Sequence, residues 1–319
     1  MKSRVLIYIL ALNISCQPTE PVSPGAIYGH ELVFDKARRE IILHGGFRPD
    51  GKLSGDTWIL NNEWELAHNG GPTARKWHAM VYDGVRQHVL LFGGRGADGK
   101  SLNDFWVWNG SYWSEIKSIG PSPRDHHRMV FEKSTGNIVL FGGWDGEKLL
   151  NDTWIWNGIF WEELSIPGPS ARAPYGFAYD ERNENVVLYG GKDLNTFFDD
   201  TWIFKNNKWT QLEIKGPPRM AFHAMTYDLK NEWTLLFSGR FNDSLFTSTW
   251  AWDGHRWDQL NDSGPIRRGI YSMVYDPERK GCIFHGSGIR ENDSWFLNGD
   301  TWIWNDKTWE ILNTSTIPK

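Results

Sequence analysis

Cysteine is almost absent from this chain of 319 residues, which contains only Cys16 and Cys282. A framework of several structural disulfides is therefore excluded, and the hydrophobic core must hold the fold together. Long apolar runs are also missing, since the apolar stretch at residues 5–12 is too short to span a bilayer. After residue 16, no stretch of ten or more residues has the spacing of an amphipathic helix.

Positive charge is not in excess either. The formal net charge is −5 at pH 7, and it becomes −7 if residues 1–15, which include Lys2 and Arg4, are removed. This balance argues against bulk binding to nucleic acid, which depends on phosphate-neutralising cations. We expect no nucleic-acid partner.

Tryptophan, by contrast, is abundant, with 20 residues, and most of them recur at a fixed spacing. One set of six is spaced by 48 residues, except for a last step of 52: Trp58, Trp106, Trp154, Trp202, Trp250 and Trp302. A glycine pair runs in phase at 45–46, 93–94, 142–143 and 190–191, and decays to Ser238-Gly239 and Gly286-Ser287. A period of this length indicates a propeller or a solenoid.

Each repeat contains four short runs rich in Val, Trp, Tyr and Phe, separated by Gly, Pro, Asn and Asp. Such runs predict four antiparallel strands. Six repeats of four strands without helices predict an all-β, six-bladed β-propeller over residues 26–312, followed by a tail at 313–319. The pairs of tryptophans two residues apart, as in Trp154 and Trp156, should pack between neighbouring blades. Because 312 ends the last copy in phase, we expect blades one and six to pack together without exchanging a strand.

The combination of Gly-Gly after an apolar run, Asn-Asp-Thr-Trp at the next strand and a Gly-Pro-x-x-Arg turn resembles kelch repeats. The form is similar to bacterial kelch proteins related to the central domain of galactose oxidase, and it covers all six copies. The resemblance implies a kelch propeller and no particular activity.

The first sixteen residues resemble a bacterial lipoprotein signal. A positive head and an apolar stretch are followed by Leu12-Asn13-Ile14-Ser15-Cys16. This pattern predicts a signal peptide at 1–15, lipidation of Cys16 and a proline-containing tether at 16–25. We therefore expect a lipid-anchored protein of the bacterial outer membrane or cell surface. A periplasmic or secreted soluble protein is the alternative. Cys282 falls in a strand and should be a buried apolar side chain.

Three sets of polar residues recur in the repeats. The first strands carry His30, His78, His127, Tyr175, His223 and Tyr271. A metal site is possible there, but hydrogen bonds that tie strands together are the favoured interpretation, and no metal or cofactor is expected. Aspartates precede the strand tryptophans at Asp56, Asp104, Asp152, Asp200 and Asp300, and arginines follow the Gly-Pro turns at Arg75, Arg124, Arg172, Arg219 and Arg267. We expect these to form bracing ion pairs. Ser248 replaces the aspartate in blade five, which should leave an arginine free for a ligand.

The loops after the glycine pairs differ from copy to copy, and they provide the candidate ligand-binding residues. These are Arg48, Arg95, Trp144, Lys192, Arg240, Phe241, Arg290 and Trp295. Cations among exposed aromatic rings suit a protein, a peptide or an acidic glycan.

We therefore predict a monomeric, non-catalytic binding or protein-interaction propeller without catalytic residues, in contact with the membrane only through its lipid anchor. One alternative is an enzyme acting on a sugar acid, since similar bacterial kelch propellers include a periplasmic sialic-acid mutarotase. Another alternative is a structural or assembly protein of the envelope.

Overall fold

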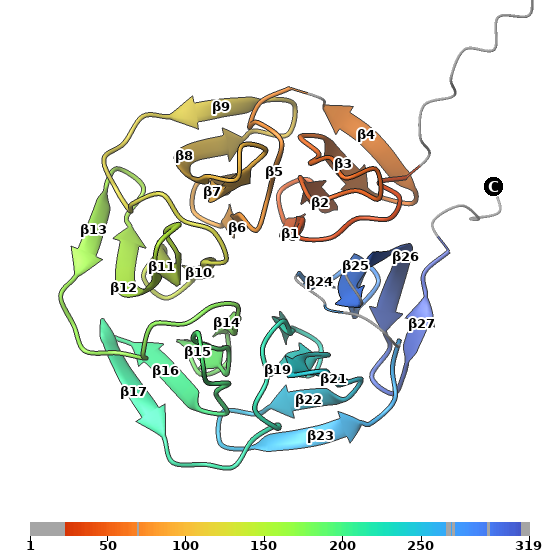
Figure 1. Cartoon of the computed structure of the whole chain (residues 1–319). Coiled ribbons are helices and arrows are strands. Elements are labelled where there is room, and N and C mark those ends of the chain that lie inside the picture. The colour runs from red at the N-terminus through yellow and green to blue at the C-terminus, as the bar shows by residue number, and fades with distance from the viewer. Residues whose placement is uncertain (1–22, 69, 266–268, 270–271, 292–293, 314–319) are drawn as a thin grey trace, which may run out of the picture.

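The computed structural model describes residues 23–68, 70–265, 269, 272–291 and 294–313, and the predicted Cys16, signal peptide and most of the tether lie outside these ranges. The described residues form six antiparallel sheets, the blades, arranged in a ring around a central axis, and one separate two-stranded hairpin (Figure 1). Within these ranges the chain forms no helix, and so none with the length and apolarity needed to cross a bilayer. The predicted all-β propeller with six blades of four antiparallel strands is confirmed.

In every blade the strands follow chain order from the axis outward. Blades 1 to 3 consist of β1 Glu31–Asp35, β2 Glu40–His44, β3 Thr57–Leu60 and β4 Trp64–His68; β5 Arg75–Lys76, β6 Ala79–Asp83, β7 His88–Gly96, β8 Ser101–Trp108 and β9 Trp113–Ile116; and β10 Arg128–Glu132, β11 Asn137–Trp144, β12 Leu149–Trp156 and β13 Trp161–Leu164. Blades 4 to 6 consist of β14 Gly176–Asp180, β15 Asn185–Tyr189, β16 Thr201–Lys205 and β17 Lys208–Leu212; β18 Ala224–Asp228, β19 Trp233–Phe237, the small hairpin β20 Arg240–Phe241 and β21 Ser244–Leu245, β22 Thr249–Trp252 and β23 Trp257–Asn261; and β24 Val274–Asp276, β25 Gly281–Glu291, β26 Ser294–Trp304 and β27 Trp309–Ile311.

In blades 1 to 4 the glycine pair lies where the second strand meets the next blade. Gly93 and Gly94 have φ values of 62° and 100°, in the left-handed region that favours glycine, and the strand register shifts there. A Cβ on Gly93 would lie 2.7 Å from the carbonyl oxygen of Arg124 in the linker to blade 3. The repeat therefore conserves glycine where the inter-blade linker crosses the strand.

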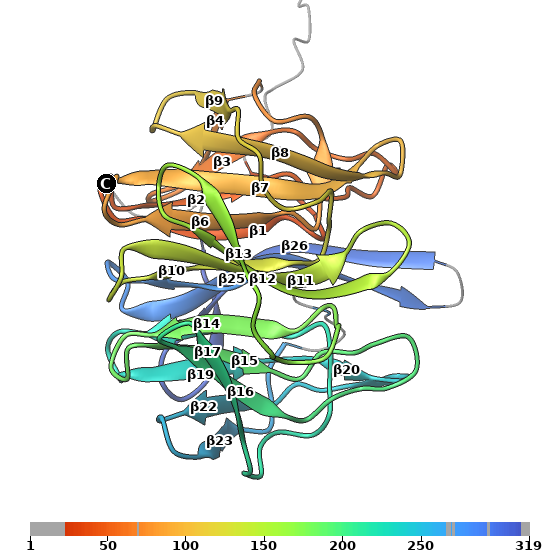
Figure 2. The same ribbon diagram turned by 90° about the vertical axis from the view of Figure 1, so that its left-hand side faces the viewer.

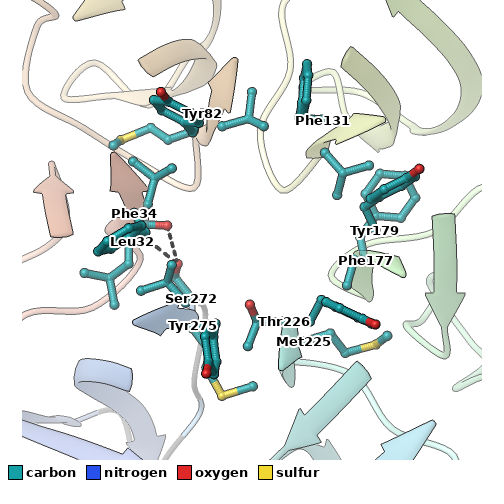
Figure 3. Close-up of a pocket in the computed structure, with 18 of the residues that line it drawn as sticks. Leu32, Phe34, Tyr82, Phe131, Phe177, Tyr179, Met225, Thr226, Ser272 and Tyr275 are labelled. Carbon is teal, nitrogen blue, oxygen red and sulfur yellow. Dashed lines mark hydrogen bonds between the residues drawn. The ribbon is translucent and has the colours of Figure 1, made fainter. Parts of the chain in front are cut away.

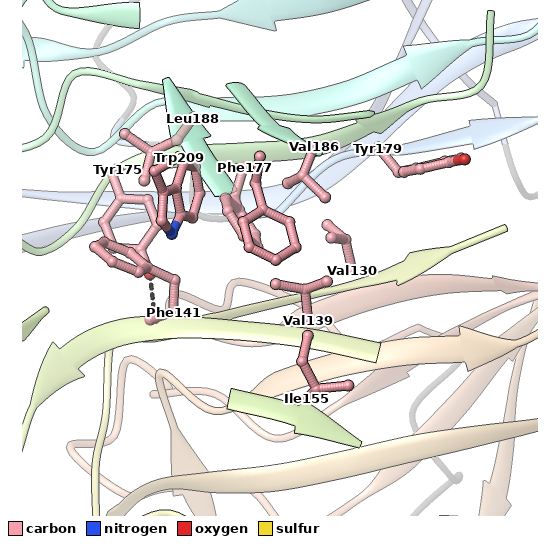
Figure 4. Close-up of a cluster of buried hydrophobic side chains, with 11 residues drawn as sticks. Val130, Val139, Phe141, Ile155, Tyr175, Phe177, Tyr179, Val186, Leu188 and Trp209 are labelled. Carbon is pink, nitrogen blue, oxygen red and sulfur yellow. Dashed lines mark hydrogen bonds between the residues drawn. The ribbon is translucent and has the colours of Figure 1, made fainter. Parts of the chain in front are cut away.

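The hydrophobic core is divided among the six joints between blades, and each joint has its own cluster. Figure 4 shows the joint between blades 3 and 4, where Phe141 of blade 3 faces Phe177 and Trp209 of blade 4. Trp209 is only 5% exposed, and burying such a side chain removes roughly 200 Å² from water.

The second tryptophan of each pair is buried as predicted, whereas the first is half-buried in five of six blades. Four of the five half-buried rings donate their indole N–H to the aspartate two residues earlier, as Trp154 does to Asp152 at 2.7 Å, and Trp250 donates to Ser248 instead. The first tryptophan of the pair therefore also holds the aspartate in place.

A tryptophan–threonine hydrogen bond joins the fourth strand of one blade to the third strand of the preceding blade. Trp113 of blade 2 donates its indole N–H to Thr57 of blade 1 at 2.8 Å. The same bond recurs for Trp209 with Thr153, Trp257 with Thr201 and Trp309 with Thr249, each at 3.0 Å. Phe105 takes the place of threonine in blade 2, and the N–H of Trp161 has no partner among the described residues.

The ring closes through this same bond. Trp64 of blade 1 donates to Thr301 of blade 6 at 3.2 Å, and a hydrophobic cluster around Ile41 and Ile283 fills the joint. At the opposite end of the same joint, the guanidinium of Arg279 in blade 6 donates to the backbone carbonyl of Asn61 in blade 1. Arg38 of blade 1 donates in the same way to the backbone carbonyl of Asn109 in blade 2. Blades 1 and 6 each keep their own four strands, so the predicted closure without strand exchange is confirmed.

The predicted arginine–aspartate pairs form in blades 2 to 4. Three buried arginines make bidentate ion pairs with aspartates: Arg75 with Asp104, Arg124 with Asp152 and Arg172 with Asp200. In blade 3, the guanidinium of Arg124 donates to Asp152 at 2.7 and 2.8 Å and also to the carbonyl oxygens of Gly142 and Ser122. Asp300 belongs to blade 6, where Arg267 lies outside the described residues.

Blade five departs from this pattern in a way that the sequence analysis misjudged. The residue that aligns with the buried arginines is Met220, which is itself buried, and not Arg219. Arg219 lies in the exposed linker, 3.5 Å from Asp199. Because both the cation and the carboxylate are replaced, by Met220 and Ser248, the prediction of a freed arginine is wrong.

Candidate functional site

The two ends of the ring differ. One end, here called the loop face, carries the linkers between blades and the loops that join second and third strands. The other end, here called the turn face, carries the tight turns between first and second strands. Figure 2 shows the blades from the side, with the hairpin of β25 and β26 projecting beyond the other loops. The four extra residues of the sixth repeat therefore lengthen a hairpin on the loop face.

Left-handed residues border the opening of the channel on the loop face. Trp77, His126 and Phe222 have φ values of 59°, 56° and 60°, and each directly precedes a first-strand histidine. The amide of Trp77 donates to Gly29 at 2.7 Å, and the amide of His126 donates to Trp77 at 2.9 Å. This backbone arc places consecutive side chains of blades 2 and 3 side by side, and non-glycine residues with positive φ concentrate at functional sites.

An aromatic cluster, consisting of Tyr28, Phe47, Trp77 and Trp295, surrounds one part of this opening. The ring of Trp295 lies 5.1 Å from Tyr28 and 5.8 Å from Phe47, and Tyr28 lies 6.5 Å from Trp77. The ammonium of Lys76 lies 4.0 Å from the ring of Trp77 and 5.0 Å from that of Phe47. The cluster thus joins blades 6, 1 and 2 and holds a cation between two rings.

A groove of about 770 Å³ continues from this cluster. It lies between the loop that joins β2 to β3 in blade 1 and the projecting hairpin of β25 and β26. Phe47 and Pro49 line one side, and Trp295 and Phe296 line the other. Trp295 is 38% exposed and Phe296 is 49% exposed. Exposed aromatic side chains beside a groove are typical of a surface that binds a partner.

Three of the predicted ligand-binding arginines already have carboxylate partners in their own loops or the next. Arg48 pairs with Asp56, Arg95 with Asp125 at 2.9 Å, and Arg240 with Asp243 at 3.5 Å. The guanidinium of Arg95 also lies 5.3 Å from the ring of Trp77. These arginines hold the loops in shape, and of the three Arg95 is the one that touches the aromatic cluster.

The other predicted residues fall in different places. Trp295 belongs to the aromatic cluster, while Arg290 faces it across the β25–β26 ladder. Trp144 is half-buried and pairs through its backbone with Asp125. Lys192 and Phe241 gather around Phe197 on blades 4 and 5, with the Lys192 ammonium 4.9 Å from that ring and Phe241 5.3 Å from it. The predicted residues therefore do not form one site: Trp295 and Arg95 meet at the aromatic cluster, while Lys192 and Phe241 meet around Phe197.

The described histidines and the tyrosine of the aligned first-strand set are buried, and two of them bond to the preceding blade. Tyr175 donates to the carbonyl of Phe141 in the preceding blade, and Nε2 of His223 lies 3.1 Å from the carbonyl oxygen of Tyr189. The predicted strand-tying hydrogen bond is therefore confirmed for Tyr175 and His223, whereas both ring nitrogens of the buried His78 have no hydrogen-bond partner among the described residues. Burial lowers the pKa of His30 and His223 to about 3. Tyr271 lies outside the described residues, and no group of three metal-ligating side chains occurs in the part of the chain that the structure describes.

Asp125 and His126 form a pair at the same opening. The carboxylate of the buried Asp125 accepts from Nδ1 of His126 at 2.5 Å and from the hydroxyl of Ser101 at 2.8 Å. The ring of His126 lies 4.1 Å from that of Trp77. Burial lowers the pKa of His126 although Asp125 acts to raise it, so the imidazole is neutral at pH 7 with its second nitrogen, Nε2, as the basic atom.

Lys76, Asp125 and His126 were not among the residues predicted from the sequence. They occupy the two positions between the buried arginine and the aligned first-strand histidine of their repeats. These two positions are Lys-Trp in blade 2 and Asp-His in blade 3. Neighbouring columns hold the same residue types in several copies, while this pair of columns varies. The only indication in the sequence was that these two repeat positions vary while the positions on either side of them stay constant. This variation does not reveal the left-handed backbone that directs the side chains to the opening.

The sequence model of the KLHDC2/KLHL20/DRC7 Kelch-repeats domain matches residues 61–168. This range covers the outer strand of blade 1 and all strands of blades 2 and 3, which is roughly a third of the chain. No curated protein matches the chain. The structure shows a six-bladed propeller, and a kelch-repeat model matches the part of it that contains Lys76, Trp77, Asp125 and His126.

Proposed function

We propose that the protein is a non-catalytic binding protein that captures an acidic segment of a partner protein on its loop face. Kelch propellers commonly bind proteins, which supports this class of function. The observation that carries the proposal is the position of Lys76 between the rings of Phe47 and Trp77.

The ammonium group of Lys76 provides the positive charge that an acidic ligand would need. Among the residues described, no carboxylate lies within ion-pair distance of it, whereas the arginines nearby are paired. Burial lowers the pKa of Lys76, and the charge of Arg95 acts in the same direction. A carboxylate of a bound peptide would compensate this partly desolvated charge, while the groove between Phe47 and Phe296 would take its apolar side chains.

Affinity selection from a random peptide library on the intact protein tests this proposal. The selected peptides are expected to contain Asp or Glu beside aromatic or aliphatic residues. Lys76→Ala should weaken their binding by about tenfold or more, because a charge-assisted hydrogen bond contributes about 1.5–3 kcal/mol. The matched control is Lys192→Ala, which removes a similar lysine–aromatic contact on blade 4. Equal loss in both variants, or none in Lys76→Ala, would contradict a site centred on Lys76.

A second candidate function is acid–base catalysis on a sugar acid, and the Asp125–His126 pair favours it. Mutarotation needs a group that can take and return a proton, and a histidine oriented by a buried carboxylate is suited to this. Arg95 and Lys76 lie close enough to hold an acidic substituent of the sugar.

NMR exchange between the anomers of sialic acid tests the second candidate. The intact protein is expected to accelerate the exchange, and His126→Gln should slow it by about 10²-fold or more. Asp125→Asn should shift the pH profile of the remaining activity, because it changes the partner that orients the imidazole. Exchange no faster than in buffer would exclude this activity and leave the binding function.

We also propose that Cys16 carries lipid and displays the propeller at a bacterial outer membrane or cell surface. The chain enters the ring beside blade 6, where the carbonyl oxygen of Gly25 lies 3.0 Å from Nε2 of His285. A tether that ends there would leave both faces of the ring accessible. A Cys16→Ser variant that still fractionates with membranes would contradict the lipid anchor.

A further inference from the structure

A cavity of about 220 Å³ lies on the axis of the ring, here called the axial chamber. Figure 3 shows that side chains from all six inner strands surround it. One aligned position of these strands supplies an almost wholly apolar wall: Val33, Val81, Val130, Ala178, Thr226 and Val274. Four of the six methionines of the chain also line it: Met80, Met129, Met225 and Met273.

At its loop-face end, the axial chamber is closed by a network that crosses the channel. Arg128 of blade 3 donates to the carboxylate of Glu31 of blade 1 at 3.0 Å, and Ser272 of blade 6 donates to the same carboxylate at 2.6 Å. The side chains of Arg128 and Glu31 are only 10% and 11% exposed. Both oxygens of Glu31 are therefore occupied by partners from other blades.

At its turn-face end, an ion pair lies across the opening. Glu181 of blade 4 binds Lys36 of blade 1 at 3.2 Å and Lys133 of blade 3 at 2.9 Å. Blades 1 and 4 are opposite in a ring of six, so the first of these bridges spans the mouth. Lys36 is 51% exposed, and an exposed pair of this kind contributes only about 0–1 kcal/mol, so it can open at little cost.

We propose that the axial chamber binds a small, uncharged, apolar molecule that enters from the turn face. The charged groups at each end are paired with one another, so a charged ligand would lose its hydration without gaining a counter-charge. A bound water needs two to four polar partners, and Thr226 is the single hydroxyl in the aligned tier of the wall. Methionine side chains adapt to ligands of different shape, which suits such a wall.

The volume sets the size of the ligand. An engineered apolar cavity of about 150 Å³ holds benzene, so a cavity of 220 Å³ should take a molecule of roughly nine heavy atoms. This site does not depend on the loop-face proposal, because its entrance is at the opposite end of the ring and shares no residue with the aromatic cluster.

Methyl NMR of the intact protein, labelled at its methionine methyl groups, tests the proposal with propylbenzene as probe. Saturable shifts are expected for Met80, Met129, Met225 and Met273. Met220 is the internal reference, because it is buried at the joint between blades 4 and 5 and does not line the chamber. Benzoate, the charged probe, is expected to leave all five signals in place.

Two substitutions at one position distinguish a chamber ligand from a nonspecific effect. Thr226→Phe fills the cavity and should weaken propylbenzene binding at least tenfold, whereas Thr226→Val keeps the volume and should preserve binding. Thermal melts of both variants establish that they are folded, and an unfolded Thr226→Phe would be replaced by Thr226→Leu. Shifts at Met220 equal to those of the four lining methionines, no shifts at all, or equal binding of benzoate would overturn the proposal.

Discussion

Between pH 7.5 and pH 5 the propeller is expected to lose about 3–4 kcal/mol or more of its stability. Burial lowers the pKa of His30, His44 and His223 to about 3, against about 6.5 in an unfolded chain. Between these two values the unfolded chain binds protons that the folded chain does not, so the free energy of unfolding falls as the pH falls. Burial also lowers the pKa of His78 and His127, which act in the same direction.

The expected size is large. Each such histidine contributes about 1.4 kcal/mol per pH unit, or about 2 kcal/mol at pH 5, and three together remove about 6 kcal/mol. Glu31 acts in the opposite direction, because burial raises its pKa to about 7 in spite of Arg128, and it offsets about 2–3 kcal/mol at pH 5. The net loss from these four groups is about 3–4 kcal/mol, and His78 and His127 add to it, which is a substantial part of the roughly 5–15 kcal/mol by which domains are stable.

Urea unfolding followed by tryptophan fluorescence at pH 7.5 and pH 5 measures this loss. His223→Gln is the matched variant, because its amide can still donate to the carbonyl of Tyr189 but takes up no proton. The variant should lose about 2 kcal/mol less than the parent between the two pH values. Equal stability of the parent protein at both pH values would show that the buried histidines are protonated without unfolding.

Asp152→Ser is expected to destabilise the protein by about 3–5 kcal/mol, because it leaves the buried guanidinium of Arg124 without its counter-charge. The side chain of Arg124 is 1% exposed, so its charge is largely removed from water. Serine at this position can still accept from the indole of Trp154, as Ser248 does from Trp250 at 3.0 Å in blade five. The cost should therefore come from the arginine and not from the tryptophan.

The double variant Arg124→Met/Asp152→Ser copies the natural composition of blade five. It should recover at least about 2 kcal/mol of the loss, because a buried ion pair can often be replaced by apolar side chains of similar size. Chemical denaturation of the two single variants and the double variant gives the coupling energy directly. Additive effects of the two substitutions would mean that the pair contributes no mutual stabilisation and that blade five differs for another reason.

The fold could be predicted from the sequence because its determinants are local and recur in every repeat. The Gly-Gly pair, the paired tryptophans and the aspartate before them each have the same contacts in several blades. The arginine–aspartate pairs were predictable for this reason, and the blade-five error came from assigning Arg219 to the column that Met220 occupies.

The loop face was less predictable because its geometry depends on single departures from the repeat. Arg48 pairs with Asp56 and Arg240 with Asp243 inside loops of unique sequence, and no pattern in the other copies reveals such contacts. Trp295 was selected because it lies outside the repeat positions, and the structure places it in the aromatic cluster. Lys76 and His126 were missed because a left-handed backbone, and not side-chain chemistry, brings them to the opening.

The joint between blades 6 and 1 is the place where the polypeptide is not continuous, yet Trp64 and Thr301 make the same bond there as Trp209 and Thr153 do elsewhere. Covalent connection is thus not what distinguishes one joint from another. The order in which the blades occur along the gene is therefore separable from the shape of the ring, and a chain opened at a different linker would encode the same closed molecule.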